Sequence, residues 1–184
     1  MTEPLVDVTI AVHSQTRPIA RAVSSVLDHT TAPVRVNVVA HNIDPEIIRA
    51  NLGAYAADPR LRLLHLADGI ASPAGPMNHG FARSEAPFLS LMGSDDELAP
   101  GAIDSWLALQ QRTGAEMVLA KIRLADGRTD PYPPIRGGRR TTGLDGRKDR
   151  LAYRSAPLGL IDRARFHRPH ARLRPRGSRL HHQR

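Results

Sequence analysis

The sequence contains no cysteine, so disulfide bonds and thiol chemistry are excluded. Aromatic residues make up only 4 % of the chain, so a buried core has to rest on Leu, Val, Ile and Ala. No apolar run approaches the roughly 18 residues that a membrane-spanning helix needs. The first residues also lack the basic start and apolar run of a signal peptide. We therefore expect a soluble, cytoplasmic protein without a transmembrane segment, although peripheral contact with a membrane stays open.

Several catalytic signatures are missing as well. No G-x-G-x-x-G follows the first apolar segment, and there is no Walker sequence. Nucleophile-elbow and H-E-x-x-H sequences are also absent. These absences argue against dinucleotide-dependent enzymes, P-loop enzymes, α/β-hydrolases and zinc peptidases.

Positive charge is concentrated at the C-terminus. Of the net charge of +8, the six arginines of residues 167–184 contribute +6, which leaves +2 for residues 1–166. We expect residues 1–166 to form one domain and residues 167–184 a basic, disordered tail. The tail has no aromatic side chain to stack on bases, so no nucleic-acid partner is expected. The abrupt change of composition after Phe166 favours instead a truncated or frameshifted C-terminus.

Apolar segments alternate between strand and helix periodicity along residues 6–124, which predicts a three-layer α/β/α domain with a mainly parallel central sheet. The predicted strands are Val6–Val12, Val34–Ala40, Leu61–Leu66, Phe88–Met92 and Glu116–Leu124. The predicted helices are Pro18–His29, a helix that starts at Asp44-Pro45, Asn78–Ser84 and Gly101–Arg112.

The remaining segments are less regular. Residues 68–77 and 125–150 are rich in Gly and Pro, which predicts loops, the second of them long enough to act as a lid. Leu144–Tyr153 is predicted to form a short helix. Ala156–Phe166 is predicted to carry one more strand, at the margin of the sheet.

Three consecutive acids, Asp95, Asp96 and Glu97, follow the predicted strand Phe88–Met92. Ligands of open α/β sheets bind at the carboxyl ends of strands, and Mg²⁺ and Mn²⁺ prefer carboxylate oxygens. The acids therefore indicate a metal site for a phosphorylated ligand. They are also consistent with caps for the next helix, which is expected to begin near Pro100 or Gly101, because acids before a helix are common. The spacing alone leaves both interpretations open.

Residues 6–124 resemble the nucleotide-sugar-binding half of inverting family-two glycosyltransferases, which have the GT-A fold. The resemblance rests on residues 8–14 (Val-Thr-Ile-Ala-Val-His-Ser), Arg17-Pro18, residues 22–27, Asn78-His79-Gly80 and residues 91–102. The last of these matches the metal motif of the family together with the helix after it, and its acids, proline and helix start all fall in register.

The resemblance implies a donor that is a nucleoside-diphosphate sugar and an acceptor that is a glycan, a lipid or a small molecule. It implies Mn²⁺ or Mg²⁺ held through the Ser94-Asp95-Asp96 motif, with Asp95 as the direct ligand and Asp96 in support. The residues implied in nucleotide-sugar binding are Val12, His13, Ser14, His41, Asn42, Asn78 and Ser94.

The chain also departs from the family pattern. His41 and Asn42 stand where the family commonly has an Asp pair that contacts the base, and Asn42 can hydrogen-bond a base edge instead. Gly93 replaces the first acid of the D-x-D motif, which removes a ribose contact. Met77 stands in place of the usual Arg before Asn-x-Gly.

No residue matches the carboxylate base that the family uses to deprotonate its acceptor. Asp145, Asp149 and Asp162 remain downstream, but their settings differ from the family motif, so the catalytic residue is unknown. One alternative is a donor-binding pseudoenzyme or inactive fragment. Another is a sugar-phosphate nucleotidyltransferase, which would need a Gly-rich loop where residues 13–17 contain no glycine.

Overall fold

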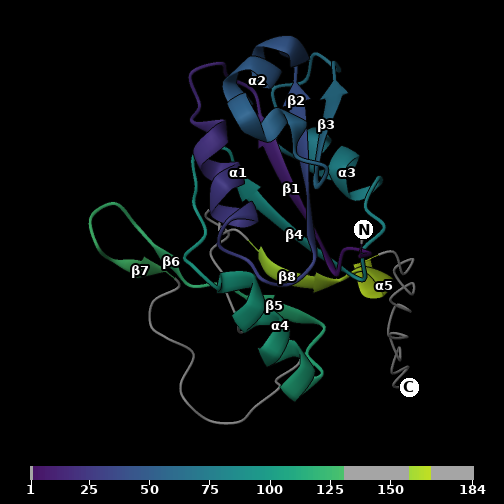
Figure 1. Ribbon diagram of the computed structural model, residues 1–184, viewed down its shortest axis with the longest axis vertical. Coiled ribbons are helices and arrows are strands. Elements are labelled where there is room, and N and C mark those ends of the chain that lie inside the picture. The colour runs from purple at the N-terminus through teal and green to yellow at the C-terminus, as the bar shows by residue number, and fades with distance from the viewer. Residues whose placement is uncertain (1, 131–157, 167–184) are drawn as a thin grey trace, which may run out of the picture.

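A computed structural model describes residues 2–130 and 158–166 of the chain, and it contains a six-stranded sheet in the order β3-β2-β1-β4-β8-β5 (Figure 1). The strands of this sheet are β1 (Val6–Val12), β2 (Val34–His41), β3 (Leu61–Leu66), β4 (Phe88–Gly93), β5 (Met117–Leu119) and β8 (Leu158–Asp162). Two further strands, β6 (Ile122–Arg123) and β7 (Thr129–Asp130), pair with each other in a separate hairpin.

Four strands of the sheet are parallel. β1 pairs in parallel with β2 on one side and with β4 on the other, and β2 pairs in parallel with β3. β8 runs antiparallel to both of its neighbours, β4 and β5. The predicted mainly parallel sheet is therefore confirmed.

Helices cover both faces of the sheet, as predicted. The helices are α1 (Ile19–Leu27), α2 (Pro45–Leu52), the 3₁₀-helix η1 (Gly53–Ala57), α3 (Ala74–Phe81), α4 (Ala102–Thr113) and α5 (Arg163–Phe166). Figure 1 shows α1 and α2 on one side of the parallel strands and α3 on the other. Within the described residues, no helix has both the length and the apolar character needed to cross a membrane.

The main core lies between the sheet and the face that carries α1, α2 and α4. Alternate residues of β1 and β2 point into it, since side chains on a strand alternate between the two faces. These buried residues are Val6, Val8, Ile10, Val12, Val34, Val36, Val38 and Ala40. Ile48, Leu52, Ile103 and Leu107 pack on them from the helices. The core is thus aliphatic, as the low aromatic content requires.

The opposite face of β1 and β2 is polar and still buried. Asp7, with no exposed surface, accepts hydrogen bonds from Nε and Nη2 of Arg35 at 2.6 and 2.8 Å. The backbone N–H groups of Glu85 and Ala86 also donate to Asp7, at 2.7 and 2.9 Å. The pKa of Arg35 is raised, and the main cause is the hydrogen bond that Arg35 donates to Asp7. Both oxygens of the buried carboxylate therefore accept hydrogen bonds.

Two sequence predictions differ from the observed bounds by more than two residues. The predicted strand Glu116–Leu124 is broken into β5 and β6, and only β5 joins the main sheet. The predicted helix Asn78–Ser84 begins earlier, at Ala74, so the second part of the predicted loop 68–77 is helical. Pro73 and Pro76 fit this early start because the first turn of a helix needs no N–H from them.

The additional strand predicted within Ala156–Phe166 is confirmed as β8, but its predicted place at the margin of the sheet is wrong. β8 lies between β4 and β5, with Leu160 and Ile161 buried. The predicted loop 125–150 falls largely outside the described residues, and the predicted helix Leu144–Tyr153 and tail 167–184 fall wholly outside them.

We expect Asp7→Ala to lower the free energy of unfolding by about 3–5 kcal/mol, because it leaves Arg35 buried with less compensating charge. The loss should fall near the lower end, since Glu85 stays 3.0 Å from Arg35. Urea unfolding measures it. The matched control is Glu46→Ala, which removes an exposed ion pair with Arg49 and should cost about 0.5 kcal/mol or less. A loss below 1 kcal/mol for Asp7→Ala would contradict the role assigned to this pair.

Candidate functional site

The carboxyl ends of β1, β2 and β4 lie at one edge of the sheet because the three strands are parallel and in register. Val12 pairs with Ala40 of β2, and Ala11 pairs with Gly93 of β4. The segments that follow these strands therefore meet at the same edge. His13, His41 and Asp95 therefore share one edge of the sheet.

A pocket of about 520 Å³ opens at this edge. Five of the seven residues predicted to bind the nucleotide sugar line it: Val12, His13, His41, Asn42 and Ser94. Asp95 lines it too, and it is the only carboxylate among the described residues of the lining. The sequence prediction thus selects residues from three different strand ends that the fold brings together around one cavity.

Ser14, Asn78 and Asp96 lie outside the lining of this pocket. The Ser14 hydroxyl is 2.9 Å from the Thr16 hydroxyl and accepts from the Thr16 N–H, so it shapes the loop between β1 and α1. Asn78 lies on α3, just after the lining residue Met77. Binding roles for these residues stay predictions.

One wall of the pocket was missed by the sequence analysis. It consists of Ala71, Ser72, Pro73, Pro76 and Met77, at the end of a loop and the start of α3. The available signal was the proximity of this Pro-rich segment to Asn78-His79-Gly80 in the sequence. Apart from Ser72, its side chains are apolar and none is charged, so the wall offers a surface for a flat or apolar part of a ligand.

The three acids after β4 have separate partners. Asp95 forms an ion pair with Arg17, in the loop before α1. Glu97 forms an ion pair with Arg21, one turn further along, at 2.6 Å. Asp96 Oδ2 accepts from the backbone N–H of Gly93 at 3.2 Å. The mutual repulsion of the acids is therefore relieved by two arginines of the neighbouring segment.

The alternative that these acids cap the following helix is wrong. α4 begins at Ala102, behind a left-handed Gly101 as its N-cap, and no described side chain makes a cap hydrogen bond there. The acids stand at the strand end instead and face Gly93 and the arginines.

The residues around Gly93 fit a divalent cation. A Cβ built on Gly93 would lie 2.9 Å from Asp95 Oδ1 and 2.8 Å from Asp96 Oδ2, so both carboxylates converge on the space beside this glycine. No group of three or more acidic or His side chains arranged to hold a metal occurs within the described residues. Two carboxylates nevertheless suffice for Mg²⁺, which is usually held by one or two of them together with substrate phosphates and water.

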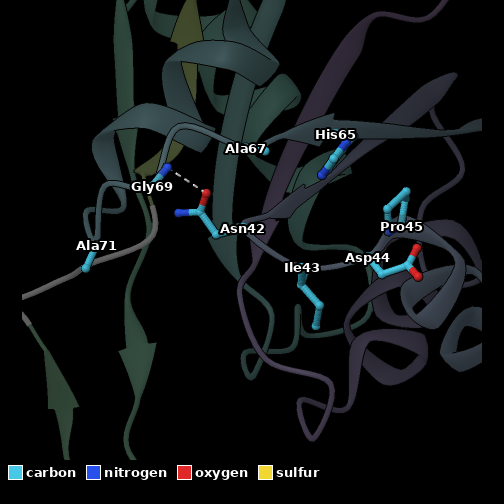
Figure 2. Close-up of a pocket in the computed structure, with 8 residues that line it drawn as sticks. All are labelled: Asn42, Ile43, Asp44, Pro45, His65, Ala67, Gly69 and Ala71. Atoms are coloured by element: carbon cyan, nitrogen blue, oxygen red, sulfur yellow. Dashed lines mark hydrogen bonds between the residues drawn. The ribbon is translucent and has the colours of Figure 1, made fainter.

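A second, wider hollow of about 710 Å³ lies beside the first, at the ends of β2 and β3 (Figure 2). It is lined by Asn42, Ile43, Asp44, Pro45, His65, Ala67, Gly69 and Ala71. Asn42 and Ala71 line both hollows, so they form the ridge between them.

Asn42 ties the end of β2 to the loop that follows β3. Its Oδ1 accepts from the Gly69 N–H at 2.9 Å, as Figure 2 shows, and its Nδ2 donates to Asp68 Oδ1 and to the Ile70 carbonyl, both at 3.3 Å. Asn42 also has a left-handed backbone with φ 54°, which Asn tolerates better than most residues. Its amide thus closes this loop, and contact with a base stays a prediction.

Asp68 is the centre of the same network. Its Oδ1 accepts from the Ile70 N–H at 2.9 Å and lies 2.9 Å from Nε2 of the buried His41. These bonds, the one from Ile70 first, hold the pKa of Asp68 below its ordinary value. The carboxylate therefore positions His41 and the loop while it stays ionised at neutral pH.

Comparison with known families gives one match. The model of glycosyl transferase family 2 matches residues 7–168, which is most of the chain. No curated protein matches the sequence.

Solved structures show the same fold. The crystal structure of S. aureus TarS 1-349 is 18 % identical, with a TM-score of 0.68, and the match covers 86 % of this chain and 47 % of that one. The same S. aureus fragment in complex with UDP-GlcNAc matches equally well, with a TM-score of 0.68, 18 % identity and coverage of 86 % and 45 %. The chain thus spans less than half the length of these structures.

The Asp68 network predicts a pH-dependent contribution to stability. Because the folded pKa of Asp68 lies below the unfolded value of about 3.9, its contribution is present above that value and is lost as the pH falls through the folded pKa. We expect the urea midpoint of the native chain to exceed that of Asp68→Asn at pH 7, and the difference to shrink as the pH falls below about 5. Glu46→Gln is the control, with a small difference throughout. A gap that stays constant across this range would contradict the prediction.

Proposed function

Since the chain belongs to glycosyl transferase family 2 and has its GT-A fold, we propose that it binds a nucleoside-diphosphate sugar and transfers the sugar to an acceptor. The observation that carries this proposal is the pocket at the carboxyl edge of β1, β2 and β4, which combines Asp95 with five of the residues expected at the donor. Residues 1–166 would form the donor-binding domain.

In the proposed complex the nucleoside lies over the ends of β1 and β2. Val12 and the wall from Ala71 to Met77 provide apolar contact area, and His13 and His41 provide hydrogen-bonding groups. The Asn42–Asp68 network holds His41 and the loop after β3 in place before the donor binds. Binding then costs little conformational entropy at these residues.

The diphosphate would then extend towards Ser94 and Asp95 on the β4 side. Mn²⁺ or Mg²⁺, when bound by Asp95 and Asp96, supplies Lewis-acid stabilisation of the negative charge that develops on the leaving diphosphate. Ser94 is buried, and as a hydroxyl at the pocket wall it can donate to a phosphate or sugar oxygen.

One observation favours the alternative of donor binding without transfer. Asp162, a candidate base, pairs with Phe88 at the start of β4, on the edge of the sheet opposite to Asp95. Its Oδ1 also accepts from the Ala164 N–H at 2.9 Å. Asp162 is therefore too remote to deprotonate an acceptor in the pocket, while Asp145 and Asp149 lie outside the described residues.

We expect Mn²⁺ to strengthen the binding of UDP by about tenfold, which corresponds to about 1.4 kcal/mol, and Asp95→Ala to abolish this gain. The reason is that Asp95 and Asp96 would hold the cation beside Gly93, where its positive charge would favour a diphosphate in the pocket. Calorimetric titrations of UDP with Mn²⁺ and with EDTA measure the difference. The control is Asp126→Ala, which removes an exposed carboxylate paired with Arg128 on the β6–β7 hairpin. Equal UDP affinity with Mn²⁺ and with EDTA in the native chain would rule out Asp95 as a ligand.

The donor and the activity are tested separately. A thermal-shift screen across UDP-, GDP- and dTDP-sugars, each with Mn²⁺, should show stabilisation by one base class over the others, because bound ligand stabilises the folded state. Release of the nucleoside diphosphate from that donor, with and without candidate acceptors, then separates a transferase from a donor-binding protein. Stabilisation without any turnover would favour the alternative, and no stabilisation by any donor would contradict both.

A further inference from the structure

Arg17 lies next to the pocket without lining it. Its guanidinium contacts Asp95, which does line the pocket, and the contact is to one carboxylate oxygen, Oδ2. The other oxygen, Oδ1, is the one that converges with Asp96 Oδ2 on the space beside Gly93. Arg17 therefore touches the proposed cation site only through Asp95.

The backbone around Arg17 is held at several points. The Arg17 N–H donates to the Ser14 carbonyl at 3.3 Å, and the Arg17 carbonyl accepts from the Ile19 N–H at 2.8 Å. Nδ2 of Asn51, on α2, donates to the Gln15 carbonyl at 2.7 Å and fixes the middle of the loop. The guanidinium is thus presented from a shaped loop at the start of α1, and little ordering is needed for it to meet Asp95.

Arg21 offers an internal comparison. It lies four residues further along and pairs with Glu97 at 2.6 Å, and both side chains are about half exposed. Its contact with Asp95 itself is to the backbone carbonyl, at 3.4 Å, and not to the carboxylate. Arg21 therefore anchors the same loop but does not orient a carboxylate of the pocket.

An arginine beside a metal-binding carboxylate can act in two opposite ways. It can occupy the carboxylate and compete with the cation, or it can hold one oxygen and so aim the other. Here one oxygen of Asp95 is bound and the other points to the space where Asp96 also points. Mutation of a residue that orients a metal-binding side chain in this way typically costs tenfold to a hundredfold in metal affinity or activity.

We propose that Arg17 is a positioning residue for Asp95: by binding Oδ2 it turns Oδ1 towards Asp96 Oδ2, and so assembles the two-carboxylate site for a divalent cation beside Gly93. This inference rests on the cation of the proposed function. Beyond the proposed function, the inference makes the cation site depend on Arg17, a cationic side chain of the loop between β1 and α1 that lies outside the acidic motif.

The test is the affinity for Mn²⁺ itself in the absence of any nucleotide, measured from the free Mn²⁺ signal in electron paramagnetic resonance. We expect Arg17→Ala to weaken Mn²⁺ binding by about tenfold. Arg17→Lys should recover part of the loss, since an ammonium can also donate to a single oxygen. Arg21→Ala should leave the affinity within about twofold of the native value, because Arg21 pairs with Glu97.

Circular dichroism and thermal melts of each variant check the fold, and Arg17→Gln replaces Arg17→Ala if the latter does not fold. Mn²⁺ affinity in Arg17→Ala that equals or exceeds the native affinity would overturn the proposal, as would the absence of Mn²⁺ binding by the native chain. UDP binding measured in EDTA tests the proposed function independently of the cation. If the native chain binds UDP but not Mn²⁺, the role of Arg17 is refuted and the proposal of donor binding still stands.

Discussion

The buried carboxylate of Asp7 is the point at which three parallel strands are joined. It sits on β1, binds Arg35 on β2, and accepts the N–H groups of Glu85 and Ala86 just before β4. A charge inside the protein is tolerated only when it is paired and hydrogen-bonded. A slip of one residue between β1 and β2 would turn Asp7 or Arg35 to the wrong face and leave the charge unpaired. The pair therefore sets the register at the amino ends of the strands, and with it the positions of their carboxyl ends.

A second constraint acts on the same face of the sheet. A Cβ on Gly80 of α3 would lie 2.4 Å from Cγ2 of Thr9, so only glycine allows the helix to pack this closely on β1. Close packing of α3 places Pro76 and Met77, in its first turn, against the carboxyl edge of the sheet. One wall of the pocket thus depends on a helix–strand contact that lies outside the pocket lining, at Gly80 and Thr9.

Charge at the carboxyl edge is arranged around α1 and β4. The arginines of the first loop and helix neutralise acids that are distant in sequence, and Gly93 leaves the space on which Asp95 and Asp96 converge. In the sequence, Gly93 is a departure from the acidic motif of the family. In the structure, the missing side chain is what leaves room for both carboxylates, since any Cβ there would lie within 3 Å of each of them. The replacement of the family's acid by Gly93 is therefore what allows Asp95 and Asp96 to adopt these positions.

The sequence by itself determined the local elements: a β-branched apolar run gave β1 its bounds, a leucine-rich run gave β3 its bounds, and Asp44, which caps the Glu46 N–H, marked the start of α2. It also determined the edge of the site, because residues after parallel strands meet at one edge. Only the tertiary structure decided that β8 fills the space between β4 and β5, that Arg17 holds Asp95, and that Asn42 binds the loop after β3. Periodicity and caps act over a few neighbouring residues, whereas these partners are brought together by packing across the sheet, which a local pattern does not encode.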